Sequence, residues 1–402
     1  MNLPSSLIPR EAYTKRLHPF VRKPLVKVLT GQRRVGKSYL LYQLIREVLQ
    51  EDPTASVIYI NKEDFAFDAI REAADLHDYI QQRLVAGKWN YVLVDEIQEI
   101  ASFEKAIRSL LLQKQTDVYI TGSNAHLLSG ELATLLSGRT IEVQVYSLSY
   151  PEFLQFHRLE AGQTSLDLYL RYGGLPYLHN LQLTDEVVFE YLRNIYTTIL
   201  YRDVIARHSI RSNRQLENLV RFLADSVGSL FSANSISDYL KAQQVKLPHN
   251  QVQYFADCLA SAFLVHKVPR YDIKGKRRFE TGEKYYFENL GIRNALAGYR
   301  TTDRGKLVEN AVYNHLRYRG YDVKVGFWQG AEVDFVAEKE QEKIYVQVAL
   351  RLEQASTLDR EFGNLQKIGD NYSKLVVTYD LGSRNTYAGI RHLSLLEFLQ
   401  EV

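Results

Sequence analysis

The chain has 402 residues, of which 46% are hydrophobic and 12% aromatic, and these values indicate two or three folded domains rather than a disordered chain. Its single cysteine, Cys258, excludes an intrachain disulfide and argues against a cysteine-based zinc site. The net charge of +3 is close to neutral, so any contact with nucleic acid would depend on local basic patches.

The chain shows no sign of a membrane segment or of secretion. No run approaches the roughly 18 apolar residues that a bilayer span needs, and the amino-terminal residues lack the apolar stretch of a signal peptide. We therefore expect a cytoplasmic protein without a membrane partner.

Strands alternate with helices over the first 150 residues. The apolar pattern predicts strands at 24–30, 56–60, 91–94, 118–121 and 140–145, and helices at 38–50 and 103–112. This alternation is typical of a parallel sheet covered on both faces. The sequence thus predicts an α/β nucleotide-binding domain at 1–150.

A phosphate-binding loop follows the first strand. Residues 31–38, GQRRVGKS, fit the pattern G-x-x-x-x-G-K-[ST], with a strand before and a helix after. Gly31 and Gly36 permit backbone angles that let N–H groups wrap phosphates, Lys37 supplies charge to the β- and γ-phosphates, and Ser38 offers a hydroxyl to Mg²⁺. A chance glycine turn is the alternative, but both flanks favour function. The predicted ATP contacts are Gly31, Gln32, Arg33, Arg34, Val35, Gly36, Lys37, Ser38 and Tyr39.

An acidic pair ends the third strand, YVLVDE. Because ligand-contacting groups stand at the carboxyl ends of parallel strands, Asp95 is expected to hold Mg²⁺, usually through water. Glu96 is expected to orient and polarise the attacking water. The alternative is that both acids only cap the helix that begins near Gln98.

Two further polar positions are candidates for the same site. Asn124, or its neighbour Ser123, follows the strand at 118–121 and could touch the attacking water or the γ-phosphate, although a plain turn remains the alternative. Arg139 precedes the last strand and could stabilise transition-state charge, within one chain or across the interface of a homo-oligomer. Arg202 is a weaker rival for that role.

The character changes after residue 150. Residues 151–208 are helical, broken by Gly-Gly-Leu-Pro at 173–176, and we interpret them as a lid or connector. Helices at 215–226, 235–242 and 250–261 precede an extended basic stretch at 269–287, and three helices with a β-ribbon outline a winged helix at 209–300. The final part alternates again: a helix at 307–319, strands at 322–328, 332–338 and 343–350, then a helix and a last strand at 374–378.

Residues 270–278 could contact DNA or RNA. They hold Arg270, Lys274, Lys276, Arg277 and Arg278 against a single acid, so the ribbon could lie along a phosphate backbone. The helix at 250–261 carries no lysine or arginine, which favours phosphate contacts over base readout. A structural joint without nucleic acid is the alternative.

The chain resembles the prokaryotic AAA-type ATPases with a C-terminal DUF4143 region. The likeness extends over nearly the whole chain and rests on TGQRRVGKSYL, YVLVDEIQEI, ITGSNAHLL, LSGR, SLSYPEFL, GGLP, ILYRDV and KYYFENLGIRNAL. It implies a P-loop core, a winged-helix region and, at 301–402, a domain similar to the PD-(D/E)xK nuclease fold.

The nuclease pattern that this resemblance implies is incomplete. Glu309 and Asp334 could supply two metal-binding carboxylates, but Gln347 and Ala349 stand where an acid and a lysine are needed. Arg351, on the same face as Ala349, could steady charge but would be a poor base. We therefore predict that this domain does not cut nucleic acid.

The sequence as a whole predicts a Mg²⁺-dependent ATPase whose nucleotide state repositions a winged helix and an inactive nuclease-like domain on DNA or RNA. An ATP-controlled switch that binds protein partners without nucleic acid is the alternative, and an ATP-powered nuclease is a third reading.

Overall fold

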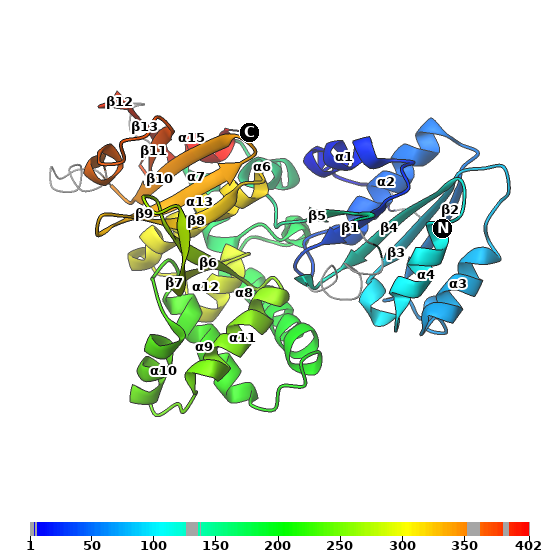
Figure 1. The fold of residues 1–402 in the computed structure, drawn as a ribbon, viewed down its shortest axis with the longest axis horizontal. Helices are drawn as coiled ribbons and strands as arrows, with labels where there is room; N and C mark the ends of the chain where they lie inside the picture. The colour runs from blue at the N-terminus through cyan, green and yellow to red at the C-terminus, as the bar shows by residue number, and fades with distance from the viewer. Residues whose placement is uncertain are drawn as a thin grey trace. The chain divides into compact units, whose positions relative to one another are not determined.

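The structure is a computed structural model, and it describes Pro4, residues 6–125, Leu136 and residues 138–351, 362–380 and 386–401, with the backbone alone at 277–281. The chain forms two compact units, coloured along the sequence in Figure 1. Unit 1 holds residues 1–146 with 261–263, and unit 2 holds residues 147–260 with 264–402.

Unit 1 is built on a five-stranded sheet in which every neighbouring pair of strands is parallel. The strands are β1 (Val26–Thr30), β2 (Ser56–Asn61), β3 (Asn90–Asp95), β4 (Thr116–Gly122) and β5 (Thr140–Gln144), in the order β2-β3-β4-β1-β5. Because β4 lies between β1 and β3, the ends of these three strands meet at one edge of the sheet. The predicted parallel sheet of the P-loop fold is confirmed.

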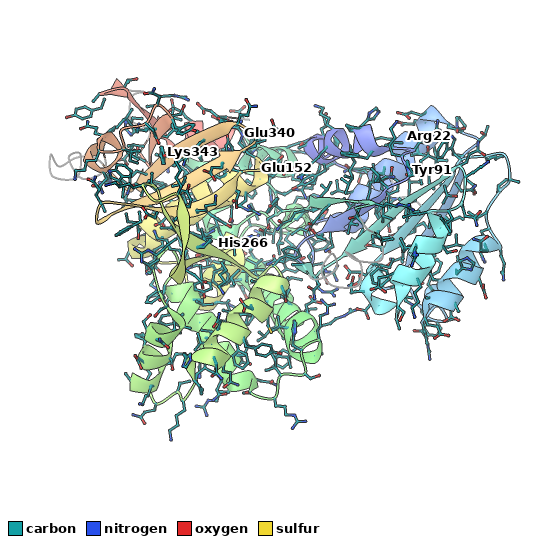
Figure 2. The ribbon with its side chains drawn as sticks, in the orientation of Figure 1. Arg22, Tyr91, Glu152, His266, Glu340 and Lys343 are labelled. Atoms are coloured by element: carbon teal, nitrogen blue, oxygen red, sulfur yellow. The ribbon has the colours of Figure 1, made fainter. Side chains whose placement is uncertain are left out.

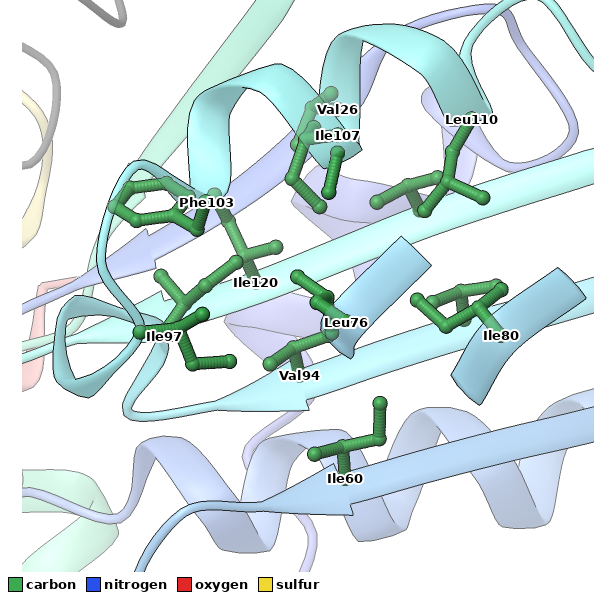
Figure 3. Packing of buried hydrophobic residues seen from close by; sticks show 14 of the residues in the cluster. Val26, Ile60, Leu76, Ile80, Val94, Ile97, Phe103, Ile107, Leu110 and Ile120 are labelled. Carbon is green, nitrogen blue, oxygen red and sulfur yellow. The ribbon is translucent and has the colours of Figure 1, made fainter. Parts of the chain in front are cut away.

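Helices cover both faces of this sheet. They are α1 (Glu11–Leu17), α2 (Lys37–Glu51), α3 (Ala73–Gln81) and α4 (Phe103–Leu110), with short 3-10 turns at η1 (His18–Phe20), η2 (Phe65–Phe67) and η3 (Ile97–Glu99). Figure 3 shows the face under α3 and α4, where apolar side chains from both helices meet alternate side chains of the strands. The core there includes Ile60, Leu76, Ile80, Val94, Phe103, Ile107, Leu110 and Ile120.

A buried ion pair joins the N-terminal ends of β1 and β4. The ammonium of Lys27 contacts the carboxylate of Asp117, and both side chains are fully enclosed. Asp117 also accepts hydrogen bonds from the backbone N–H of Arg22 at 2.8 Å and from the hydroxyl of Tyr119 at 3.0 Å. Arg22 in turn donates to the Tyr91 hydroxyl at 2.7 Å, and both residues are labelled in Figure 2. These partners compensate the charges in otherwise apolar strands.

Unit 2 begins with helices. They are α6 (Tyr150–His157), α7 (Gln163–Tyr172), α8 (Asp185–Thr198), a π-helical continuation η6 (Ile199–Ala206), α9 (Asn213–Asp225), α10 (Ala233–Ala242) and α11 (His249–Ser261), with a 3-10 turn η5 (Pro176–Asn180). The three helices predicted before the ribbon lie within about two residues of α9, α10 and α11. After the ribbon come α12 (Leu290–Ala297), η7 (Thr301–Asp303), α13 (Arg304–Tyr318) and α15 (Leu395–Gln400).

An eight-stranded mixed sheet runs through the rest of unit 2. Its order is β12-β13-β11-β10-β9-β8-β6-β7. The strands are β6 (Val265–Asp272), β7 (Arg277–Phe287), β8 (Asp322–Trp328), β9 (Ala331–Lys339), β10 (Glu342–Ala349), β11 (Ser373–Thr378), β12 (Thr386–Tyr387) and β13 (Ile390–Ser394). The expected mixed α/β region at the C-terminus is therefore present.

Two details differ from the sequence prediction. The strand at 374–378 is not the last, because β12, β13 and α15 follow it and β13 pairs in parallel with β11. The basic ribbon is not separate either: β6 pairs in parallel with β8, so the antiparallel hairpin β6–β7 forms one end of the larger sheet. Pairing between strands more than fifty residues apart leaves no local pattern in a sequence.

Candidate nucleotide-binding site

The phosphate loop joins the carboxyl end of β1 to the amino end of α2. Gly31 has φ +145°, and a Cβ there would lie 2.2 Å from the carbonyl oxygen of Val145, so the position accepts only glycine. Gly36 is left-handed, with φ +98°, and precedes the first residue of α2, Lys37. The N–H groups at the start of that helix point toward the loop end of β1 and favour an anion there.

Lys37 folds back over the loop. Its Nζ donates to the carbonyl oxygens of Gly31 at 2.9 Å and Gln32 at 3.0 Å, and it lies 3.9 Å from Oε1 of Glu96. A lysine with a side chain that is only 4% exposed needs such acceptors. Phosphate oxygens could replace these two carbonyls as acceptors for the ammonium.

Glu96 lies in a ring of polar partners. Its backbone is left-handed, with φ +54°, and its Oε2 accepts a hydrogen bond from the Gln98 amide. The same carboxylate lies 4.0 Å from Nη2 of Arg33, whose Nη1 lies 2.7 Å from a carboxylate oxygen of Glu63. Arg33 of the phosphate loop therefore stands between two carboxylates, one of them the candidate general base.

Asp95 is deeply buried, with 1% of its surface exposed. Its carboxylate accepts hydrogen bonds from the hydroxyls of Thr121 and of Tyr59, the latter at 3.2 Å. Burial raises the pKa of Asp95, while the Ser38 and Thr121 hydroxyls act in the opposite direction. Thr121 Oγ1 also accepts from the backbone N–H of Glu96 at 3.0 Å, so one β4 side chain orients both acids.

The other predicted loop residues differ in exposure. Arg34 and Tyr39 are exposed, and Tyr39 keeps 54% of its surface open to solvent. Gln32 and Val35 are buried, and the Val35 carbonyl accepts a hydrogen bond from Arg10 at 2.8 Å.

The other residues predicted to act in ATP hydrolysis, beyond the acidic pair, lie in different parts of the structure. Asn124 is buried directly after β4, at the edge where β1 and β3 also end. Arg139 is exposed just before β5, and its carbonyl accepts from the backbone N–H of Val26. Arg202 lies on η6 in unit 2.

The structure adds residues that sequence reasoning did not select. Thr121, Tyr59, Glu63 and Gln98 all touch the acidic pair or Arg33. Thr121 had a usable signal, because it is a polar residue at the end of an apolar strand beside Asp95. Tyr59 had none, since a tyrosine in a strand is ordinary.

The basic ribbon is described only in part. Lys274 and Lys276 are exposed at the turn between β6 and β7, while the side chains of Arg277 and Arg278 lie outside the described set. Arg270 packs its guanidinium over the ring of Phe327, 4.6 Å from the ring centroid.

The acids predicted for the C-terminal domain come together with a lysine from the ribbon. Lys284 of β7 lies 2.8 Å from Glu309, 2.7 Å from Glu332 and 3.5 Å from Asp334. The Tyr286 hydroxyl also donates to Glu309, at 2.6 Å. The sequence offered no sign of Lys284, because its partners are 25 or more residues away along the chain.

Gln347 and Ala349 are the two positions that depart from the nuclease pattern, and neither carries a charge that could pair with Lys284. The Gln347 side-chain oxygen accepts from the backbone N–H of Asp334 at 3.3 Å, and Ala349 is buried at the end of β10. Arg351 is exposed and lies 3.6 Å from Asp380.

The parallel sheet and the glycine-bounded loop define unit 1 as a P-loop domain, and comparison with known families agrees. An AAA domain model matches residues 23–154, a domain of unknown function, DUF8612, matches 163–303, and another, DUF4143, matches 304–394. An uncharacterized protein of Haemophilus influenzae is 35% identical over 98% of this chain and 99% of its own length. The chain therefore belongs to the family of AAA-type ATPases with a C-terminal DUF4143 region.

Two more distant proteins are also similar. Uncharacterized protein MJ1544 of Methanocaldococcus jannaschii is 28% identical over 88% of this chain and 82% of its own length. The Orc1 protein of Aeropyrum pernix, solved in complex with DNA, covers 75% of this chain and 95% of its own at 14% identity and a TM-score of 0.33. A score this low carries no conclusion about this chain. In the described ranges, no helix combines the length and hydropathy that a bilayer span requires.

Proposed function

We propose that the protein binds ATP and hydrolyses it with Mg²⁺. The observation that carries this proposal is the meeting of Lys37, Asp95 and Glu96 at the carboxyl edge of the parallel sheet, beside a loop that only glycine can form at Gly31. Phosphoryl transfer needs mainly positioning and charge, and these residues supply both.

The residues fit a magnesium ion. Ser38 and Asp95 offer the hydroxyl and carboxylate oxygens that this hard cation prefers, and the Ser38 hydroxyl already favours the ionised form of Asp95. When bound, Mg²⁺ would offset charge on the phosphates. Thr121 and Tyr59 would keep the Asp95 carboxylate in place when Ser38 turns its hydroxyl to the ion.

Glu96 would act as the base that orients the attacking water. Thr121 fixes its backbone, whereas its side chain is near Lys37, Arg33 and Gln98. As Lys37 turns from loop carbonyls to phosphate oxygens, its approach to Glu96 would loosen and leave the carboxylate to accept a water proton. Asn124 would contact the water or the γ-phosphate, whereas Arg139, which lies beside the first residue of β1 at the opposite edge of the sheet, would reach the γ-phosphate only from a neighbouring subunit.

The decisive test compares Lys37→Ala with Glu96→Gln. Lys37→Ala should weaken ATP binding by about a hundredfold or more, because a buried charged contact is lost. Glu96→Gln should bind ATP normally and lose turnover about 10²- to 10⁴-fold. Binding is measured with a fluorescent ATP analogue and turnover by phosphate release.

Matched controls lie at the opposite edge of the sheet. Lys88→Ala, before β3, and Glu51→Gln, at the far end of α2, remove the same groups from exposed positions and should leave both readouts unchanged. Equal loss of ATP binding in Lys37→Ala and Glu96→Gln would contradict the two roles.

The nucleotide state would control unit 2. We propose that unit 2 consists of a helical connector at 151–208, a winged helix at 209–300 and a nuclease-like domain at 301–402. The exposed Lys274 and Lys276 favour nucleic acid as the target over a protein partner.

Measuring the ATPase rate with DNA, with RNA and with cell extract separates a nucleic-acid target from a protein partner. Stimulation by extract alone, which protease treatment of the extract removes, would favour the protein-binding switch. We further propose a cytoplasmic location and, if Arg139 acts across subunits, a homo-oligomer.

A further inference from the structure

The acidic cluster of unit 2 encloses a lysine. The side chain of Lys284 is 3% exposed, and its Nζ has carboxylate oxygens of Glu309 at 2.8 Å, Glu332 at 2.7 Å and Asp334 at 3.5 Å. These acids come from α13 and β9, while the lysine comes from β7 of the ribbon. A single ammonium thus holds carboxylates from two other elements.

This arrangement leaves no room for the metal that a nuclease-like domain implies. The acids that would bind it, Glu309 and Asp334, are the acids that Lys284 contacts. Among the residues that the structure describes, no three His, Cys, Asp or Glu side chains form a group suited to a metal ion. The metal therefore does not fit the site as it stands.

The side-chain amide of Gln347, next to this cluster, also has a hydrogen-bond partner within the protein. The Gln347 oxygen, at the position where the nuclease pattern has an acid, accepts from the backbone N–H of Asp334. The backbone N–H of Val348 donates to the Asp334 carboxylate at 2.8 Å. Asp334 is thus oriented by β10 and by Lys284, without any need of a further ligand.

The charges explain why a cation is needed there. Three carboxylates that approach one point repel each other, and burial increases the cost. Burial and the nearby Glu309 raise the pKa of Asp334 to about 7 even though Lys284 acts in the opposite direction. Burial would lower the pKa of Lys284, but the charges of Glu309, Asp334 and Glu332 outweigh it and raise the pKa. The ammonium of Lys284, within 3.5 Å of all three carboxylates, supplies that positive charge.

We propose that the ammonium of Lys284 takes the place of the divalent cation in this nuclease-like site. It fastens the ribbon strand β7 to α13 and β9, closes the site to metal and makes the fold of unit 2 independent of metal. Removing the ammonium should then allow the carboxylates of Glu309, Glu332 and Asp334, which form no metal-binding group as they stand, to close around a cation.

The test is thermal unfolding of the full chain in EDTA and in Mn²⁺, with Asp95→Asn as the background so that the candidate ATPase site takes no metal. In that background the midpoint should be the same in both buffers. Lys284→Ala should lower the midpoint in EDTA, and Mn²⁺ at a hundredfold excess over its dissociation constant should raise it by about 5 °C or more. Adding Asp334→Asn to Lys284→Ala should abolish that gain.

Lys267→Ala is the matched control. Lys267 of β6 contacts two carboxylates, Asp257 at 3.0 Å and Glu283 at 3.2 Å, so its removal costs an ion pair without leaving three acids together. This variant should be insensitive to Mn²⁺.

Two results would overturn the proposal. One is Mn²⁺ stabilisation of the protein with Lys284 intact that disappears in Asp334→Asn. The other is a Lys284→Ala variant that folds and ignores Mn²⁺, which would make Lys284 an ordinary ion-pair partner. If Lys284→Ala does not fold in EDTA, refolding of Lys284→Ala and Lys284→Ser with Mn²⁺ decides: recovery supports the proposal, and failure of both contradicts it.

Discussion

His315 of α13 is enclosed in the interior of unit 2. Its Nε2 donates to the carbonyl oxygen of Glu401 at 3.2 Å, and its ring meets that of Phe398 edge to face. Burial, together with the nearby charge of Arg319, lowers the pKa of His315 to about 3. A histidine with a depressed pKa is neutral in the folded protein and charged in the unfolded chain below pH 6.5, the ordinary pKa of histidine.

The lowered pKa of His315 determines whether the stability of unit 2 rises or falls with pH. Between pH 6.5 and about 3 the unfolded state binds one more proton than the folded state at His315, so the stability of unit 2 should fall as the pH falls. The loss from this group approaches about 1.4 kcal/mol for each pH unit. Urea unfolding at pH 7.5 and 5.5 should show a smaller decrease for His315→Phe than for the unchanged protein. The exposed His249→Phe should behave like the unchanged protein, and equal decreases for His315→Phe would contradict the assignment.

At the scale of single residues, the sequence predicted those candidates whose positions follow from a local motif. Lys37, Asp95 and Glu96 were predictable because the loop and the strand end place them by local spacing. Thr121, Tyr59 and Lys284 were not selected, since each acts through a partner that is distant along the chain. Arg33 was predicted only as a loop residue, and its pairing with Glu63 depends on where β2 ends.

At the scale of elements, the strands of unit 1 were predictable because each is an apolar run between loops, and burial on both sheet faces produces that pattern. The short edge strand β12, with two exposed residues, has no such pattern. The joining of β6 to β8 was also hidden, because a single local sequence looks the same in an isolated ribbon and in a sheet.

The ribbon carries the prediction on nucleic acid. Replacing Lys276, Arg277 and Arg278 by alanine should weaken binding to all sequences alike, since phosphate contacts carry no base information. The slope of log affinity against log salt should fall by up to about 3, or about 0.9 for each lost contact with duplex DNA. Gel shifts at two salt concentrations measure both effects.

The control removes the same charge from unit 1. Lys105, Arg108 and Lys114 are exposed on or near α4, and their triple alanine variant should bind as before. If the ribbon variant keeps both its affinity and its salt slope, the ribbon does not contact nucleic acid and the protein-binding switch gains support.

At the scale of the whole molecule, the candidate ATPase residues lie in unit 1 and the ribbon and acidic cluster lie in unit 2. Within unit 2 the hairpin β6–β7 belongs to the same sheet as β8–β11, and Lys284 adds an ionic contact to that pairing. If ATP controls unit 2 as proposed above, the ribbon and the nuclease-like sheet would respond as one body rather than as two modules.

The last prediction is that this body does not cut nucleic acid. Lys284 occupies the acids that a metal would need, Gln347 brings no charge to offset the dehydration of Mg²⁺, and Ala349 offers a nucleophilic water nothing. Pure protein incubated with plasmid and with single strands, in Mg²⁺ and then in Mn²⁺, with and without ATP, should leave every substrate intact. Cleavage by a contaminating nuclease would persist in Asp334→Ala, whereas cleavage that this variant lacks would show that the domain is an active nuclease. Because Lys284→Ala should admit Mn²⁺ but still lacks an acid at 347, we expect it to gain metal sensitivity in unfolding without gaining nicking activity.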